Sequence, residues 1–403
     1  MYTLKPYFYD DFHCIGSECL YTCCGGWLIN IEEKIAKEYK QYRGSLKKIV
    51  EDYLVYNKEK DTYAIQLDEK GMCPFCNGEQ LCRLIKEQGE QFLSTTCRMF
   101  PRTELMTKET KEYYLSLGCP TVVSFLKGRR EPLSFILEDG EKEEDELKDA
   151  AGEERKEIEL LYEFIEMDME IRDCMVDLLQ NREWPLWFRE FLVAYCLDKI
   201  KEEHHQGRIE EVYLILKRTL EPYFVRTFME KMTSLPKDKE RQFMALRQIT
   251  NHLSDMIMGI LHLGKGGKCA AKATELLNRN LNISFEEYET AYGNWRKRAE
   301  EEHEILAEHI AAYNWMQYAM TAFTTYYMVD NYWDVILGQI LIKYFCVLQY
   351  SIYDKIEWTD IEMIVSLVCR GIHHGRETMK GKLVELKKQN WLSVSGLFVL
   401  ISP

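Results

Sequence analysis

The chain has 403 residues, 46% of them hydrophobic and 29% charged, with a formal net charge of −14. This length favours two domains over one compact core, and the composition excludes a disordered chain. The net charge is −1 over residues 1–138 and −13 over residues 139–403. An acidic second half argues against a nucleic acid partner, because phosphates bind basic surfaces. It favours either a solvated surface or an attraction to a lysine-bearing partner.

The N-terminal residues lack the continuous apolar stretch of a secretory signal. The most apolar segment, Val335–Tyr350, is interrupted by Gln339 and Lys343 and is shorter than a membrane span. These features predict a soluble, cytoplasmic protein with no membrane partner.

Short elements around cysteines are expected in residues 1–138. The alternation in Asp61–Asp68 predicts a short strand, and helices are expected over Ile31–Tyr42 and Leu81–Gln88. The charged run Glu138–Glu146 has no apolar face and predicts a linker.

Helix follows helix from about Leu147, because apolar residues recur there at helical spacing without a fixed-period repeat. Breaks between helices are expected at Asn181–Pro185, Gln206-Gly207, Ser234–Pro236, Gly264–Gly267, Asn278–Asn282 and Asn331. The sequence therefore predicts a mainly α protein. A cysteine-rich, loop-rich metal-binding domain over residues 1–138 packs on an all-α domain over residues 147–403.

Two further patterns lie in the helical half. Aromatic residues are dense over Tyr313–Tyr350, which predicts buried central helices or the wall of a pocket. Glu202-x2-His205 and Glu300-x2-His303 have the spacing of di-iron bundle ligands, but both lie in highly charged stretches that favour a solvated face.

Fourteen cysteines need an explanation, because the cytosol keeps disulfides reduced. Five are scattered singly through helical sequence and are expected to be core thiols: Cys174, Cys196, Cys269, Cys346 and Cys369. The other nine are dense: Cys14, Cys19, Cys23, Cys24, Cys73, Cys76, Cys82, Cys97 and Cys119.

Thiolates at this spacing suit zinc or an iron–sulfur cluster. Gly25 and Gly26 follow the Cys23-Cys24 pair, where their backbone can approach a negatively charged site. Buried thiols without metal are the alternative, but a Cys-Cys pair and Cys-Pro turns are poor core material.

These motifs resemble a known family, the putative zinc- or iron-chelating domain family. The resemblance rests on Cys14, Cys19, Cys23-Cys24, Cys73-Pro74, Cys82 and Cys97-Arg98-Met99-Phe100-Pro101-Arg102. Gly26-Trp27, Leu93–Cys97 and Ser116–Pro120 narrow it to the flagellin lysine-N-methylase (FliB) group. The resemblance covers roughly residues 7–125. Beyond residue 140 it is limited to a long helical region that is rich in aromatic residues near Tyr313–Tyr327.

The resemblance implies a ligand pool of Cys14, Cys19, Cys23, Cys24, Cys73, Cys82, Cys97 and Cys119. Cys76 is left out, because an apolar residue is expected there. Eight thiols exceed the four ligands of one cluster. Either some of them surround the ligands without binding the metal, or a second metal is present. The expected group is an iron–sulfur cluster of the [4Fe-4S] type, with zinc as the alternative.

The implied reaction is transfer of a methyl group from S-adenosylmethionine to surface lysines of flagellin or another lysine-rich protein. Aromatic faces suit both the sulfonium of the donor and a methylated ammonium. The candidates for the reaction site are therefore Tyr326 and Tyr327, with Tyr313 and Trp333 as candidates for binding the donor. They are expected where the cysteine domain packs on Tyr313–Trp333.

The donor has no recognisable motif in this chain. Gly264–Gly267 lies between predicted helices rather than after a strand, and the cysteine spacing is not that of radical S-adenosylmethionine enzymes. Two other functions therefore stay open. They are a non-catalytic metal-binding or metal-trafficking protein, and an iron–sulfur redox protein, each with a helical interaction domain.

Overall fold

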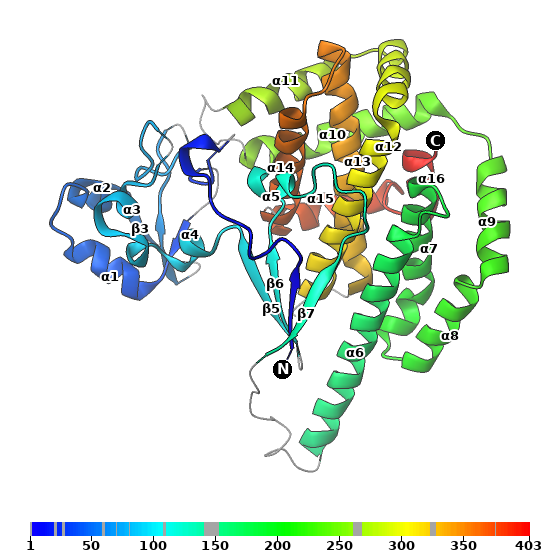
Figure 1. The fold of residues 1–403 in the computed structure, drawn as a ribbon, viewed down its shortest axis with the longest axis horizontal. Coiled ribbons are helices and arrows are strands. Elements are labelled where there is room, and N and C mark those ends of the chain that lie inside the picture. Colours follow the sequence, from blue (N-terminus) through cyan, green and yellow to red (C-terminus); the bar gives the residue numbers. More distant parts are fainter. Residues whose placement is uncertain are drawn as a thin grey trace.

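The computed structural model describes residues 2–19, 22–25, 29–58, 61–69, 71–79, 81–107, 110–140, 153–260, 268–322, 328–374 and 376–403. Within these residues the protein is mainly helical, as predicted. A small unit formed by α1 to α4 projects to one side, and the long helices gather on the other (Figure 1).

Two sheets lie in the N-terminal third. The first has the strand order β5-β6-β1-β7, formed by Arg102–Met106, Thr110–Leu115, Tyr2–Pro6 and Phe135–Asp139. β1 runs parallel to β6, with Tyr2 opposite Thr110, and antiparallel to β7, with Tyr2 opposite Asp139. The second sheet is antiparallel with the order β2-β4-β3, formed by Ile29–Ile31, Thr62–Ile65 and Leu54–Asn57. β4 confirms the strand expected in Asp61–Asp68.

Short helices surround the second sheet. They are α1 (Glu33–Gln41), α2 (Lys47–Tyr53), α3 (Arg83–Gln88) and α4 (Thr95–Met99), and α5 (Pro120–Ser124) follows Cys119. α1 and α3 confirm the two helices that were expected in this part of the chain. The first two residues of the predicted linker belong to β7, and its residues 141–146 lie outside the described residues.

The helical part runs from α6 to α16: Glu153–Gln180, Leu186–His205, Ile209–Thr219, Pro222–Ser234, Lys239–Ile260, Lys268–Asn282, Phe285–Tyr318, Met328–Tyr353, Trp358–His374, Arg376–Lys388 and Val394–Ile401. Local signals explain several boundaries. Pro185 precedes α7, and Ser284 with Glu287 forms a capping box that begins α12.

The predicted break at Asn331 is wrong, because this residue lies inside α13. Its side-chain Nδ2 donates to the carbonyl oxygens of Tyr318 and Ala319, at 3.1 and 2.9 Å. Asn331 therefore satisfies carbonyls at the end of α12, which a helix leaves without intrahelical partners. The other predicted breaks up to Pro236 fall between helices, and Gly264–Gly267 lies outside the described residues.

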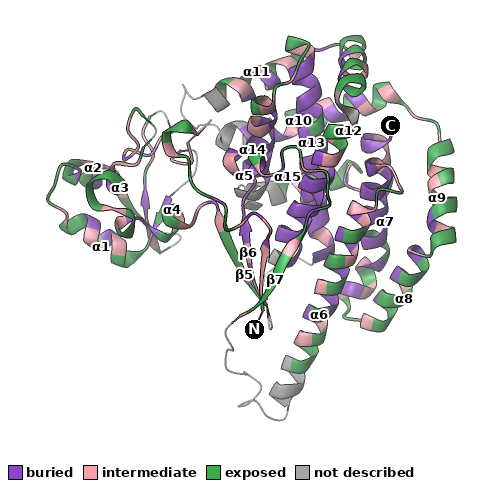
Figure 2. Ribbon diagram, in the orientation of Figure 1, coloured by how far each residue is buried: buried purple, intermediate pink, exposed green. Residues whose placement is uncertain are grey.

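The hydrophobic side chains form two separate clusters. The smaller one lies within residues 29–93 and includes Ile31, Tyr39 and Phe75. The larger one joins the long helices to the first sheet, including Phe8 and Leu115 (Figure 2). The domain boundary near residue 138 stays a prediction. The clusters indicate that the first sheet packs with the helices and that residues 29–93 are the smaller packed unit.

Buried polar contacts tie the first sheet to the helices. Arg172 of α6 donates from Nη1 to both carboxylate oxygens of Glu112 on β6, at 2.9 and 2.8 Å. Tyr114 donates to the same carboxylate at 2.5 Å. Because both members of the ion pair are almost fully buried, breaking one side would leave an uncompensated charge.

α13 is long and apolar enough to cross a membrane by length and composition alone, which the sequence reasoning did not allow for. However, 83% of its most apolar window is buried inside the protein. This burial is typical of the central helix of a bundle.

Candidate functional site

The small unit brings the dense cysteines together through its backbone. The N–H of Cys73 donates to the carbonyl of Cys24 at 2.8 Å, next to a bridge between Gly25 and Met72. A second bridge joins Cys76 to Cys82. Segments 23–25, 72–76 and 82 therefore lie side by side, although nearly fifty residues separate the first from the second.

Six thiols interact within this arrangement: Cys23, Cys24, Cys73, Cys76, Cys82 and Cys97. The Cys24 thiol is in hydrogen-bonding contact with both Cys23 and Cys76, and its contact lowers the pKa of Cys76. Burial raises the pKa of Cys73 to about 12 and that of Cys97 to about 11. Cys76, which was left out of the predicted ligand pool, thus lies among the predicted ligands.

A second pair lies closer to the helices. Burial raises the pKa of the Cys119 thiol to about 12, and Cys19 and the Arg370 guanidinium interact with it. Arg370 of α14 also donates from Nε to the carbonyl of Gly118 at 2.9 Å. Cys14, another predicted ligand, is exposed in the loop before the turn Gly16–Glu18.

The scattered cysteines were expected to be core thiols. Cys196, Cys346 and Cys369 are buried in the main core, and Cys174 packs against it. This confirms the expectation for four of the five, and the side chain of Cys269 lies outside the described residues.

Two of the four aromatic candidates for the reaction site and for donor binding are described, and both are packed in the protein interior. Tyr313 is completely buried, and its hydroxyl exchanges two hydrogen bonds of 2.8 Å with the backbone of Leu115 on β6. Trp333 is 8% exposed and packs in the main core. Tyr326 and Tyr327 lie outside the described residues.

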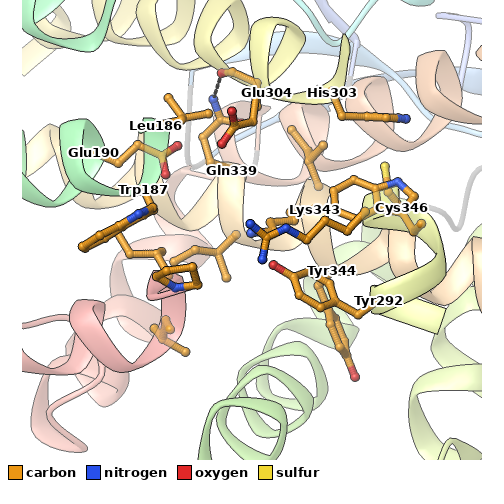
Figure 3. Close-up of a pocket in the computed structure, with 18 of the residues that line it drawn as sticks. Leu186, Trp187, Glu190, Tyr292, His303, Glu304, Gln339, Lys343, Tyr344 and Cys346 are labelled. Carbon is orange, nitrogen blue, oxygen red and sulfur yellow. Dashed lines mark hydrogen bonds between the residues drawn. The ribbon is translucent and has the colours of Figure 1, made fainter. Parts of the chain in front are cut away.

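A cavity of about 360 Å³ lies among α7, α10, α12, α13, α14 and α16. Leu186, Trp187 and Glu190 border it from α7, His303 and Glu304 from α12, and Gln339, Lys343 and Tyr344 from α13 (Figure 3). Tyr288, Tyr292 and Trp295 add an aromatic stripe at spacings of four and three residues along α12. These spacings place all three rings on one helix face.

Glu190 is the most unusual group in this wall. Its residue is 7% exposed, and its carboxylate forms no hydrogen bond or ion pair with another described residue. Burial raises its pKa, Lys343 and Arg189 lower it, and the nearby Glu304 raises it, so that the pKa lies at about 7. A buried carboxylate with this pKa can take up and release a proton near neutral pH.

The other polar groups divide between the interior and the rim. Trp295 has a buried indole N–H without a hydrogen-bond acceptor among the described residues. His303 packs its ring 5.1 Å from that indole, and burial lowers its pKa. Glu304 and Lys343 are exposed and mark the mouth.

A second cavity of about 510 Å³ adjoins the first and shares Trp295, His303, Leu306 and Ile361 with it. Several cations border it: Lys127, Arg129, Arg130, Arg298 and Lys355. The two cavities therefore meet at a wall that contains the Trp295 and His303 rings. The first cavity carries charges of both signs, and the second is mainly basic.

Comparison with known proteins assigns this chain to a family. Residues 172–400 match the model of the FliB lysine N-methylase C-terminal domain. The chain belongs to this family. The matched region contains nearly the whole first cavity.

Individual relatives agree with this assignment. The chain is 34% identical over 124 residues to the lysine-N-methylases of Salmonella choleraesuis and Salmonella typhimurium. That stretch covers 30% of this chain and 31% of each relative, so the chain matches about a third of their length. The same identity over 124 residues relates it to the flagellar biosynthetic protein FliU of Salmonella muenchen, covering 73% of that protein. No solved structure matches the chain.

Sequence reasoning did not predict the first cavity. The candidate site at Tyr313–Trp333 stays a prediction. The sequence also predicted a solvated face around His303, whereas His303 is half-buried in the cavity wall. One signal was present. Arg189 and Glu190 are two charged residues inside the apolar run Leu186–Ala194. Buried charges lower the stability of a fold unless they are paired, so two of them in such a run can indicate a functional role.

Proposed function

We propose that this FliB-family chain is a protein-lysine N-methyltransferase that transfers methyl groups from S-adenosylmethionine to surface lysines of flagellin. Three of its relatives are named lysine-N-methylase or flagellar biosynthetic protein. The observation that carries the proposal is the cavity in the family-matched region, which combines aromatic rings with an unpaired, buried carboxylate.

Amine methylation makes two demands on a site. The acceptor lysine must be neutral, and the sulfonium donor must reach it in a space that excludes bulk water. Aromatic faces favour both cations, and a carboxylate can accept the proton. Glu190 would meet the first demand by taking the lysine proton, and Tyr288, Tyr292 and Trp295 would meet the second by holding the cations against aromatic faces.

The second cavity gives the donor a place beside the acceptor. Its cations suit the carboxylate of S-adenosylmethionine, and its aromatic residues Tyr350 and Trp358 suit the adenine ring. Both cavities have volumes in the range of small-molecule sites.

The cysteines of the small unit fit a soft metal. Six thiols from four chain segments lie near one another, and they can ionise together only when a cation offsets their charge. Among the described residues, however, no three cysteine, histidine or acidic side chains already converge on one metal position.

The ligands that we propose are therefore drawn from these six together with Cys14, Cys19 and Cys119. They would hold an iron–sulfur cluster, or zinc. Thiolate ligation would stabilise the fold of a unit whose own hydrophobic core is small.

Flagellin is the proposed partner, and the cytoplasm is the proposed location, before flagellin leaves the cell. The net charge of −13 over residues 139–403 would steer a lysine-rich surface toward the helical part. Association should therefore slow at high ionic strength.

Mass spectrometry tests the function directly. Purified flagellin is incubated with the anaerobically prepared protein and S-adenosylmethionine carrying a deuterated methyl group. Labelled methyl-lysine is expected, and S-adenosylhomocysteine should appear in equal amount. Unlabelled lysines after complete incubation, with metal-loaded protein and folded flagellin, would contradict the proposal.

A metal-trafficking protein is the second candidate, and the dense thiols of the small unit favour it. The two functions differ in how tightly they hold metal. Transfer of the bound metal to an apoprotein, without methylation of flagellin, would support trafficking.

A further inference from the structure

The first cavity has a polar arrangement that its packing does not require. Glu190 lies on its inner wall without an ion-pair partner among the described residues, and the Trp295 indole N–H lacks an acceptor there. A buried carboxylate left unpaired costs stability, so a protein tends to keep one only where a ligand uses it. Two independent groups thus indicate a polar ligand in this cavity.

We propose that this cavity receives the side chain of the acceptor lysine and that Glu190 is the catalytic base that removes its proton. The inference rests on the proposed methyltransferase function and names the site of that reaction.

The walls suit a long side chain that ends in a cation. Tyr292 already attracts cations, because Nζ of Lys343 and Nζ of Lys239 lie 5.4 and 5.9 Å from its ring centre. Apolar residues such as Leu306 and Ile340 are buried beside it and can cover the methylene stem. A lysine entering from the rim would therefore pass apolar and aromatic surface before its ammonium reaches Glu190.

Glu190 fits the role of base better than the other acids and bases of the wall. Glu304 is exposed, so water competes for its contacts, and it serves as an attracting charge at the mouth. His303 lies where the two cavities meet, and burial lowers its pKa, which makes it the weaker base. Gln339 is not a base, and its amide N–H donates to the Ala307 carbonyl at 2.6 Å (Figure 3).

The reaction balances with these groups alone. The Glu190 carboxylate takes one proton from the lysine ammonium and leaves a neutral amine. The nitrogen lone pair then forms a bond to the methyl carbon while the carbon–sulfur bond breaks. Its electron pair stays on sulfur, so S-adenosylhomocysteine leaves. Glu190 then releases its proton to water at the mouth of the cavity, after which the methylated ammonium can lose its next proton in the same way.

The pH dependence follows from the groups around this carboxylate. Lys343 of α13, Glu304 of α12 and Arg189 on its own helix act on it, and Arg296 and His303 of α12 line the same cavity. Since burial raises its pKa to about 7, the rate should rise with pH through that value. Without the carboxylate, this limb of the profile should disappear.

The experiment compares the full-length Glu190→Gln variant with wild type and with Asp198→Asn. Asp198 is an exposed carboxylate on the same helix and serves as the matched control. We expect Glu190→Gln to lower kcat for flagellin methylation by about 10²- to 10⁴-fold, with a smaller change in KM and no rise of rate near pH 7. Circular dichroism confirms that each variant is folded.

Binding supplies a readout that needs no methyl transfer. The probe is Nα-acetyl-dimethyllysine methylamide, with the neutral Nε-acetyl-lysine analogue as its control, and tryptophan fluorescence reports binding because Trp187 and Trp295 line the cavity. Wild type should bind the cationic probe above pH 7, and Glu190→Gln should bind it about tenfold less tightly, as expected for one lost charge contact.

The outcomes separate the two proposals. If wild type methylates flagellin and Glu190→Gln retains its rate and pH limb, the inference is overturned while the function stands. If wild type binds the cationic probe through Glu190 but methylates nothing, the function fails while the cation site stands. Equal binding of both probes by all variants would overturn the site itself.

Discussion

Replacing Glu190 by Gln should stabilise the folded protein at alkaline pH and leave its stability unchanged at acid pH. The two side chains are nearly the same size, so the packing of α7 is kept. What changes is the charge, because burial raises the pKa of this carboxyl from 4.5 to about 7. Glutamine has no charge to bury.

The sign follows from proton linkage. A carboxyl whose folded-state pKa is raised binds its proton more tightly when folded, so the wild-type protein loses stability as the pH rises from about 4.5 to 7. At about 1.36 kcal/mol for each pH unit, the full loss is about 3 kcal/mol. Because the cavity opens at its rim and admits some water, we expect a gain of about 1 to 3 kcal/mol for Glu190→Gln near pH 9.

Urea unfolding followed by far-ultraviolet circular dichroism measures this difference. The free energies of unfolding of wild type, Glu190→Gln and Asp198→Asn are compared near pH 9 and again near pH 4.5, where the first two should agree. Asp198→Asn should change stability by less than about 0.5 kcal/mol at either pH, as for exposed sites. An equal effect of Glu190→Gln at both pH values, or a loss near pH 9, would refute the reasoning.

Three further predictions concern the metal and the packing. Cys76→Ser should reduce the iron or zinc found by elemental analysis, whereas Cys346→Ser in the main core should not, and equal metal content in both variants would remove Cys76 from the ligands. Arg172→Met should lower the free energy of unfolding by about 3 to 5 kcal/mol, because it strands the buried Glu112 carboxylate, and a loss below about 1 kcal/mol would contradict the buried pair. Removing metal with a chelator should expose residues 29–93 to proteolysis while the helical signal persists, and a single cooperative loss of both would oppose a separate small unit.

Much of the local structure could be predicted from the sequence because its causes are local. The strand β4 and the helices α1 and α3 follow from short patterns of apolar residues, and the breaks before α7 and α10 follow from proline. Asn331 misled the prediction, since its role is to bond the end of another helix.

Long-range pairing could not be predicted in the same way. β1 pairs with β6 and β7, more than a hundred residues away, and no local turn signal announces such neighbours. The first sheet was therefore assigned to the cysteine-rich part, although its side chains pack with the helices. Tyr313 shows the consequence, since a ring expected to bind the donor joins α12 to β6.

The candidate site divides along the same line. The cysteine motifs lie within short segments, so their residues could be named from the sequence, whereas the cavity collects residues from six helices. Periodicity shows that α7 is buried but does not show which of its faces meets an opening rather than a neighbour. Only the pair of charges at Arg189 and Glu190, inside an apolar run, marked that face in advance.

The distance between the cysteines and the cavity bears on what a metal could do. α14 extends from one to the other, because Arg370 bonds the Gly118 carbonyl beside Cys119 and Ile361 borders both cavities. Nine residues of helix separate Arg370 from Ile361, or about 13 Å along the axis. Cys119 therefore lies toward the end of α14 opposite Ile361, and the six clustered thiols gather around the small unit instead. Thiolate ligation would then affect activity indirectly, by stabilising the small unit. Loss of metal should therefore weaken the affinity for flagellin more than it slows the proton transfer that depends on Glu190.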